Sequence, residues 1–179
     1  MTHISPLPLD AITDPEMLAM MEQARELGTA DDLFVRLASR APVQAKAILR
    51  ELLMSHTQGN VDHRLKEVIR VLLARFADDK YFASLRSRKA QAMGLTERRL
   101  NEGVAEYEDD AKGFSEAEKI ALRFADLMYL DAGQIDKAFY DEMKKHWSEA
   151  QIMEIGSFMV VHYGMAMFMR SMGASAQKA

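Results

Sequence analysis

The stretch of sequence that decides the fold covers residues 67–94 and reads E-V-I-R-V-L-L-A-R-F-A-D-D-K-Y-F-A-S-L-R-S-R-K-A-Q-A-M-G. A glutamate opens this stretch and a glycine closes it. Between them, Asp79 stands twelve residues after the glutamate, Phe82 three residues further on, and Arg86 eight residues before the glycine. Apolar residues before Asp79 recur at three- and four-residue steps, which predicts a helix with one face in the core.

Helical patterns also cover most of the remaining chain. Its 9 glycines and 4 prolines are few, and its 14 methionines accompany many alanines and leucines, all of which favours helix over strand. We predict an all-α domain of about eight or nine helices over residues 14–179, after an N-terminal arm at residues 1–13. Ser115 with Glu118, and Ser148 with Gln151, each predict a capping box. The expected helices are 15–27, 42–56, 61–76, 79–94, 96–107, 116–129, 135–145 and 149–171, with one more capped within 29–32.

Composition narrows the classes of function. A chain of 179 residues with 49% hydrophobic content is long enough for one domain with a substantial core. Its 23 basic and 27 acidic residues are interspersed, which leaves no basic stripe for nucleic acid. The first ten residues hold two prolines and no apolar run, so we expect neither a secretory signal nor a membrane anchor there, and a cytoplasmic location. The lack of cysteine excludes disulfides and cysteine-ligated metals.

The spacing from Glu67 to Gly94 resembles the core of the carboxymuconolactone decarboxylase and alkylhydroperoxidase D superfamily. In the peroxidase branch, the glutamate is followed after twelve residues by C-x-x-C-x-x-x-H, and the glycine follows the histidine by eight. Here the two cysteine positions hold Asp79 and Phe82, and the histidine position holds Arg86. The protein therefore cannot reduce peroxides with its own thiols. The decarboxylase branch also has histidine where Arg86 stands, so neither activity carries over at that position.

The resemblance extends from about Pro42 to Arg170 and includes the R-L-K-E segment and the G-L-T-E segment after the motif. It implies an alkylhydroperoxidase D-like helical bundle. It also implies assembly as trimers or hexamers, with pockets close to the subunit contacts.

Glu67 lies nearly opposite the apolar stripe of its own helix, beside a thinner apolar strip. If both sides of the helix are buried, its carboxylate is partly desolvated and suited to proton transfer near neutral pH. The alternative is a solvated side chain that pairs with Arg70 or Arg64.

On a continuous helix over 79–94, Asp79, Phe82 and Arg86 would share one face and line one wall of a pocket. Arg86 would hold a carboxylate or enolate but cannot serve as a general base. Phe82 would pack against an aromatic or alicyclic ring, and Tyr81 would donate a phenolic hydrogen bond. Asp79 has an alternative role as the N-cap of this helix.

The last helix carries the segment S-F-M-V-V-H-Y-G-M-A-M-F-M, which is apolar around nearly its whole circumference. With His162, Tyr163 and Gly164 at its centre, this 13-residue segment is too short and too polar to span a bilayer, so we expect a central or subunit-interface helix. His162 is the best remaining general acid or base, and Tyr163 a hydrogen-bond donor. The alternative is a buried pair with structural hydrogen bonds.

Other chemical motifs are missing, including G-x-G-x-x-G, the P-loop, G-x-S-x-G and H-E-x-x-H. His56 and His63 flank a turn, but two histidines without a placed carboxylate make a poor metal site, so we expect neither a metal nor a cofactor. The leading hypothesis is a cofactor-independent lyase or isomerase that acts on a small carboxylated or oxygenated ring compound of aromatic or lactone catabolism. Its proton would be moved by Glu67 or His162.

The alternative from another class is a non-enzymatic oligomer that binds a ligand or a partner. A peroxidase that uses an external thiol ranks below both.

Overall fold

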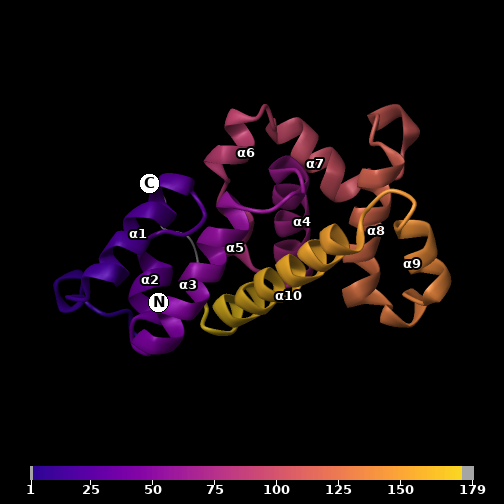
Figure 1. Cartoon of the computed structure of the whole chain (residues 1–179). Helices are drawn as coiled ribbons and strands as arrows, with labels where there is room; N and C mark the ends of the chain where they lie inside the picture. Colours follow the sequence, from indigo (N-terminus) through magenta and orange to yellow (C-terminus); the bar gives the residue numbers. More distant parts are fainter. Residues whose placement is uncertain (1, 175–179) are drawn as a thin grey trace.

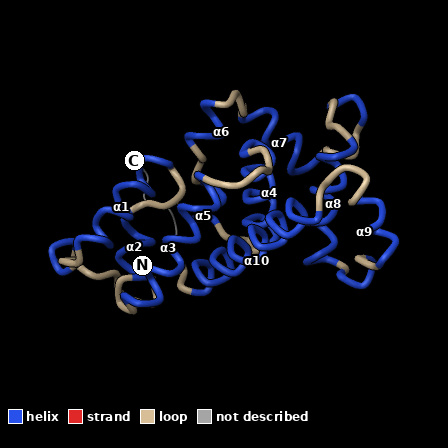
Figure 2. The backbone as a smooth tube through the Cα atoms, viewed as in Figure 1, coloured by secondary structure: helices blue, strands red, loops and turns tan. Residues whose placement is uncertain are grey.

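Helices make up all the regular secondary structure in residues 2–174, which are the residues that the computed structural model describes (Figure 2). Met1 and residues 175–179, assigned above to the arm and to the domain, lie outside this range. The α-helices are α1 (Pro15–Leu27), α2 (Asp32–Ala38), α3 (Pro42–Thr57), α4 (His63–Phe76), α5 (Lys80–Ser84), α6 (Arg88–Ala92), α7 (Glu97–Ala105), α8 (Glu116–Leu130), α9 (Lys137–Met143) and α10 (Glu149–Ser171), with 3-10 turns at Leu9–Ala11, Asp110–Lys112 and Ala132–Gln134. The all-α prediction is confirmed.

Helix α10 organises the molecule. Figure 1 shows it running from the α8–α9 end to the α2–α3 end, across α4. Its first half packs into a core formed with α4, α7 and α8, and its last turns pack into a second core formed with α1, α2, α3 and α5. Tyr163 borders both cores. Of the two predicted alternatives, a central or a subunit-interface helix, the first holds in that α10 joins both cores, although one of its faces is exposed.

Helix α10 is also longer than its apolar segment. Its 23 residues make it long and apolar enough to cross a bilayer by length and composition, which corrects the judgement made on the 13-residue segment. Core helices of soluble proteins meet the same criterion, and 44% of its most apolar window is buried inside this chain.

Helices α1, α8 and α10 begin at the capping residues that the sequence predicts. Asp14 caps α1 and Pro15 occupies its first position. Complete capping boxes open α8 at Ser115 and α10 at Ser148, where the side chain three residues later bonds back to the cap.

The prediction of one helix over 79–94 is wrong. The chain forms two short helices, α5 and α6, separated by an extended Leu85 and by Ser87, which caps α6. Neither glycine nor proline stands at this break, so its cause is tertiary. The linker lies close to the end of α1. A Cβ added at Gly28, whose φ is 69°, would lie only 2.3 Å from the carbonyl oxygen of Arg86, so this position requires glycine.

Candidate functional site

The motif segment is built around a buried ion pair. Glu67 and Arg70 are 1% and 2% exposed, and Arg70 binds the carboxylate through Nε (2.8 Å) and Nη2 (2.7 Å). Each of the two predictions for Glu67 is partly right. The carboxylate is desolvated, as the first predicted, and it pairs with Arg70, as the alternative predicted. Arg64 pairs instead with Asp62.

This ion pair causes the break between α5 and α6. Arg70 also donates to the carbonyl oxygens of Phe82 (2.6 Å) and Leu85 (2.7 Å), and the Ser87 amide donates to Glu67 (2.8 Å). The ion pair therefore supplies hydrogen-bond partners for two carbonyl oxygens and one amide of the segment between α5 and α6. The Glu67 carboxylate thus accepts three hydrogen bonds from its own chain, out of about four that its two oxygens can accept.

Asp79 is the N-cap of α5, as the alternative predicted. Its carboxylate accepts from the amides of Tyr81 (3.2 Å) and Phe82 (2.8 Å). Burial raises the pKa of Asp79, and the two amide hydrogen bonds oppose this shift.

Tyr81 and Phe82 are core residues, 0% and 2% exposed. The Tyr81 hydroxyl donates to the Asp31 carboxylate and accepts from the Asp31 amide (3.0 Å), so its hydrogen-bonding capacity is used inside the protein. Burial and the Asp31 carboxylate raise the pKa of Tyr81 well above its usual value. Phe82 packs edge to face on Phe34, with 5.6 Å between ring centroids.

Arg86 lies in the linker rather than on a helix face. Its Nε donates to Glu97 (2.7 Å), and its Nη1 donates to the carbonyl oxygens of Ala83 (2.6 Å) and Leu85 (2.7 Å). The expected wall of Asp79, Phe82 and Arg86 is therefore not formed, because the helix that would align them is interrupted. The Arg86 guanidinium is already paired with the Glu97 carboxylate of the same chain.

A second cluster lies where α3 and α10 cross. His162 is 3% exposed, its Nε2 is 3.2 Å from the Ser55 hydroxyl, and its ring lies 4.0 Å from that of Phe158. The His56 ring packs edge to face on His162, with 5.2 Å between centroids. Burial lowers the pKa of His162 well below its usual value, and the positive charges of Arg70 and Lys66 act in the same direction. The imidazole is therefore neutral at pH 7.

His56 is unusual in this cluster. Among residues 2–174, its Nε2 is the only fully buried side-chain nitrogen or oxygen without a hydrogen-bond partner. Burial lowers the pKa of His56 well below its usual value, with the charges of Arg70, His63 and Lys66 adding to the shift. His56 packs on the ring of His162, not in a metal site with His63. No group of three or more metal-ligating side chains occurs in the described part of the chain.

A pocket of about 160 Å³ opens beside this cluster, between α3, α4 and α10. Ser55, Lys66, Glu154 and Phe158 are among the residues that line it. The Lys66 side chain is 3% exposed, pairs with Glu154, and donates to the carbonyl oxygens of Ser55 (3.3 Å) and Gln58 (3.1 Å). The pocket thus combines the Lys66–Glu154 ion pair, a second carboxylate from Glu51, a hydroxyl and an aromatic face, with a neutral imidazole directly behind the hydroxyl.

The sequence did not single out these lining residues. Ser55 and His162 are 107 residues apart, so no local spacing relates them. Lys66 carries little sequence signal for a buried role, because lysine is rarely buried. The R-L-K-E segment that holds it was noted only for its resemblance to relatives.

Tyr163 lies away from this pocket. Its half-buried ring stacks on Tyr129 with 3.7 Å between centroids. Burial and the neighbouring Tyr163 raise the pKa of Tyr129 to about 12. The structure therefore separates Tyr163 from His162, although the two are adjacent in sequence.

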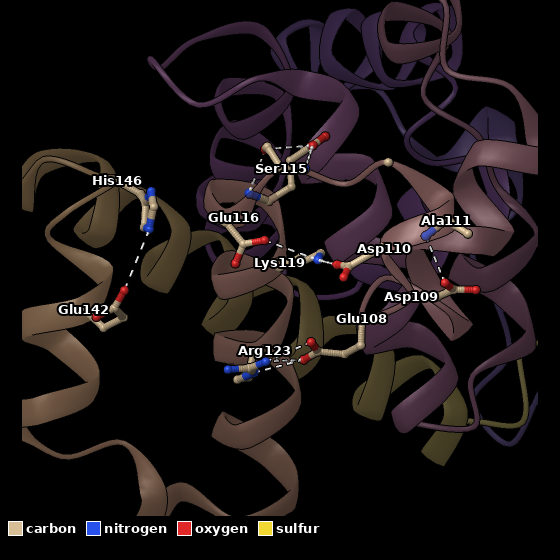
Figure 3. Close-up of polar contacts among 12 residues, drawn as sticks. Glu108, Asp109, Asp110, Ala111, Ser115, Glu116, Lys119, Arg123, Glu142 and His146 are labelled. Carbon is tan, nitrogen blue, oxygen red and sulfur yellow. Dashed lines mark hydrogen bonds and ion pairs between the residues drawn. The ribbon is translucent and has the colours of Figure 1, made fainter.

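The surface around α8 carries many charges, but they neutralise one another. Figure 3 shows Arg123 paired with Glu108, Lys119 with Asp110 and Glu116, and His146 facing Glu142. The distance from His146 Nε2 to the Glu142 carboxylate is 4.0 Å. Asp110 and Glu116 are largely exposed. These are solvated ion pairs rather than a convergent site.

No protein-family model matches this sequence, and no curated protein matches it. Solved structures do match its fold. The apo debrominase Bmp8 has a TM-score of 0.79 at 19% identity, over 96% of this chain and 90% of that chain. A cysteine-to-alanine variant of Bmp8 in complex with 2,3,4-tribromopyrrole has a TM-score of 0.81 at 19% identity, over 99% and 92% of the two chains.

An alkylhydroperoxidase AhpD core structure, of an uncharacterized peroxidase-related protein from Ralstonia eutropha JMP134, has a TM-score of 0.81 at 12% identity. The match covers 99% of this chain and 93% of that chain. The predicted resemblance to the alkylhydroperoxidase D-like superfamily is thus confirmed as a shared fold. At these identities the likeness concerns the fold alone.

Proposed function

We propose that this chain, which has the alkylhydroperoxidase D-like fold, is a thiol-independent and cofactor-independent lyase or isomerase. Its substrate is a small ring compound that carries a carboxylate or an oxygen substituent, of the kind that aromatic or lactone catabolism handles. The observation that carries this proposal is the Ser55–His162 contact (3.2 Å) at the wall of a pocket that also contains Lys66 and Phe158.

Proton transfer would pass through Ser55. The Ser55 hydroxyl now donates to the Leu52 carbonyl (2.9 Å), and it can rotate toward Nε2 of His162. When the hydroxyl oxygen takes a proton from a carbon next to a carbonyl or carboxyl group, its own proton passes to His162. The same pair then returns a proton to another ring carbon, which completes an isomerisation. The neutral Nε2 has a lone pair for that proton, and because burial disfavours the imidazolium, the proton would be held only until it returns to the ring.

The electron pair left by the proton would move onto the substrate oxygen. Lys66 would stabilise the resulting negative charge from the pocket wall by exchanging one of its present partners, Glu154 or the carbonyl oxygens of Ser55 and Gln58, for the substrate oxygen. Phe158 offers a flat apolar surface to the ring. These residues would take the roles first assigned to Arg86, Glu67 and Phe82.

The neighbouring structures support an enzyme with a small-ring ligand in general terms. One of them is a debrominase seen in complex with a tribromopyrrole. This chain has no cysteine, so any chemistry on such rings would be acid–base chemistry rather than thiol chemistry. We further propose that the protein acts in the cytoplasm as a soluble homo-oligomer, a trimer or a hexamer, that binds neither nucleic acid nor a membrane.

The test uses NMR in D₂O with a panel of ring carboxylates, lactones and halogenated pyrroles. We expect at least one compound to exchange a carbon-bound proton or lose CO₂ in the presence of the wild type, and Ser55→Ala to slow this at least tenfold. The matched control is Ser171→Ala, which removes another serine that donates to a carbonyl three residues earlier, outside this pocket. Equal rates for the wild type and Ser55→Ala would refute the mechanism.

A second candidate function is non-enzymatic ligand binding. It is favoured by a cavity of about 340 Å³ between the N-terminal arm, α2, α3 and the end of α10. Its walls are mainly apolar and include Met165, Met169 and Met172, whose pliable side chains suit an irregular apolar ligand. A compound that stabilises the protein equally in the wild type and in Ser55→Ala, without turnover, would support this candidate.

A further inference from the structure

We infer that two copies of this chain associate through the outer face of α10, in antiparallel orientation, about a two-fold axis at Val160. The dimer itself does not depend on the proposed function. Its effect on the pocket, described below, does.

The outer face of α10 is apolar but uncovered. Figure 1 shows α10 in front of the other helices, with none drawn over it. Met153, Val160, Met167 and Phe168 are 68%, 63%, 40% and 56% exposed. On the neighbouring α3, Ile48 and Met54 are also exposed, so this face holds half of the twelve large exposed hydrophobic side chains in the described residues. An apolar face of this kind marks an interaction site.

The spacing along this face is symmetric about Val160. Met153 and Met167 stand seven residues before and after it, and Gly156 and Gly164 stand four residues before and after. Seven-residue steps keep side chains on one side of a helix, here over about 21 Å. When α10 is paired with a reversed copy of itself, methionine lies opposite methionine and glycine opposite glycine. A two-fold contact requires this kind of self-complementarity.

The glycines allow the two helices to approach closely. A Cβ added at either Gly156 or Gly164 would have no heavy atom within 4 Å, so both positions open onto free space. The stretch from Ile155 to Met169 contains no charged residue, so burying it desolvates no charge on α10, and Glu51 of α3 is the charged residue that lines the adjoining groove.

The helix dipoles and the charges at the helix ends favour the antiparallel orientation. Glu149 at the start of α10 and Arg170 at its end have side chains that are 78% and 52% exposed, and within their own chain they pair with Lys144 and Asp78. Reversed helices place each of these charges near its opposite, and they also align the two helix dipoles favourably. Parallel helices would place like charges together.

A groove beside α10 fits one side chain of the second copy. It has a volume of about 540 Å³ and is lined by Phe124 and Met128 of α8, Tyr140 of α9, and Met153, Ser157 and Val160 of α10. In the reversed copy, Met167 and Phe168 lie opposite the start of this groove. The exposed Phe168 ring of each copy would enter the groove of the other.

The dimer would also cover the proposed site. Glu51 and Ser157 line both this groove and the pocket that holds Ser55 and Lys66. A second copy seated in the groove therefore closes one side of the pocket mouth and keeps water away from Ser55. A two-fold contact is present in a dimer or a hexamer but absent from a trimer, so this inference favours a hexamer over a trimer.

The absence of cysteine makes a clean test possible, because any disulfide must come from an introduced residue. On mild oxidation, we expect Val160→Cys to form a covalent dimer with itself. Met153→Cys and Met167→Cys, linked with a short bis-maleimide, should cross-link mainly with each other when mixed. Met93→Cys, at an exposed position at the end of α6, is the matched control and should remain monomeric on the gel.

Sedimentation equilibrium of the full chain supplies the second measurement. Val160→Glu should lower the assembly mass at least two-fold with an unchanged helical spectrum, and Met93→Glu should not. A wild type that is monomeric, or a trimer that survives Val160→Glu, would overturn the inference. Flotation of a monomeric wild type with phosphatidylcholine vesicles would also overturn it, since the face would then belong to lipid.

Discussion

The motif segment and the α3–α10 crossing are both buried and both carry ionisable groups, yet they are hydrogen-bonded very differently. At the motif, Glu67 accepts three hydrogen bonds and Arg70 donates four, and all of their partners belong to the chain. At the crossing, His56 Nε2 has no partner and His162 reaches a pocket through Ser55. The Glu67–Arg70 pair binds several groups of its own chain and so holds structure, whereas His162 contacts a hydroxyl that faces a pocket. The difference suggests that the motif has become a structural support.

The largest expected effect comes from breaking the motif ion pair. Glu67→Gln should lower the free energy of unfolding by about 3–5 kcal/mol, because it leaves the Arg70 charge buried without a counter-charge. Urea denaturation measures this as a lower midpoint with an unchanged slope. The double variant Glu67→Gln with Arg70→Met should recover part of the loss. A single variant as stable as the wild type would show that the pair is not a support.

The next effect is a dependence of stability on pH from the two histidines. Because burial lowers the pKa of His56 and of His162, only the unfolded chain takes up their protons as the pH falls below about 6.5. Stability is therefore complete above that pH and declines below it, by about 1.4 kcal/mol per pH unit for each histidine. The pKa of His63 is also lowered by burial, so His56→Met should reduce the total slope by about 1.4 kcal/mol per pH unit without removing it. An unchanged slope in urea titrations from pH 7 to pH 5 would assign the dependence to other groups.

A smaller effect is expected at Asp79. Asp79→Ala removes the N-cap of α5 and should cost about 1 kcal/mol. Asp79→Asn keeps a capping oxygen and should cost less. Thermal unfolding of the two variants beside the wild type measures the difference, and equal melting temperatures for both variants would argue against a capping role.

The smallest effect is expected at Arg86. Arg86 is 25% exposed and its partner Glu97 is 57% exposed, so Arg86→Ala should change the free energy of unfolding by no more than about 1 kcal/mol. Urea denaturation under the same conditions compares the free energy of unfolding of Arg86→Ala with that of Glu67→Gln. A loss as large as that of Glu67→Gln would mean that the linker depends on Arg86 as much as on the buried pair.

Much of the fold could be predicted from local patterns, since helix periodicity and caps depend on neighbours in sequence. Ser115, Ser148 and Asp79 act as caps in the structure as their spacing indicates. The break at Leu85 could not be predicted in this way. It comes from Arg70, fifteen residues earlier, whose guanidinium binds the Leu85 carbonyl.

The candidate site was harder to predict for the same reason. His162 was singled out as an isolated histidine on an apolar helix, but Ser55, His56 and Lys66 join it only through the packing of α3 and α4 against α10. Lysine and serine carry little sequence signal for burial. Only the three-dimensional structure relates these residues.

The central claim is that function resides at the α3–α10 crossing and not at the motif segment. The most direct measurement compares the rates of the wild type, His162→Gln and Arg86→Ala on the first compound that the D₂O screen identifies, with the fold of each variant checked by its melting temperature. Our account predicts that His162→Gln lowers the rate at least tenfold and that Arg86→Ala leaves it within twofold. Loss of turnover in Arg86→Ala, with His162→Gln unaffected, would return the site to the motif segment.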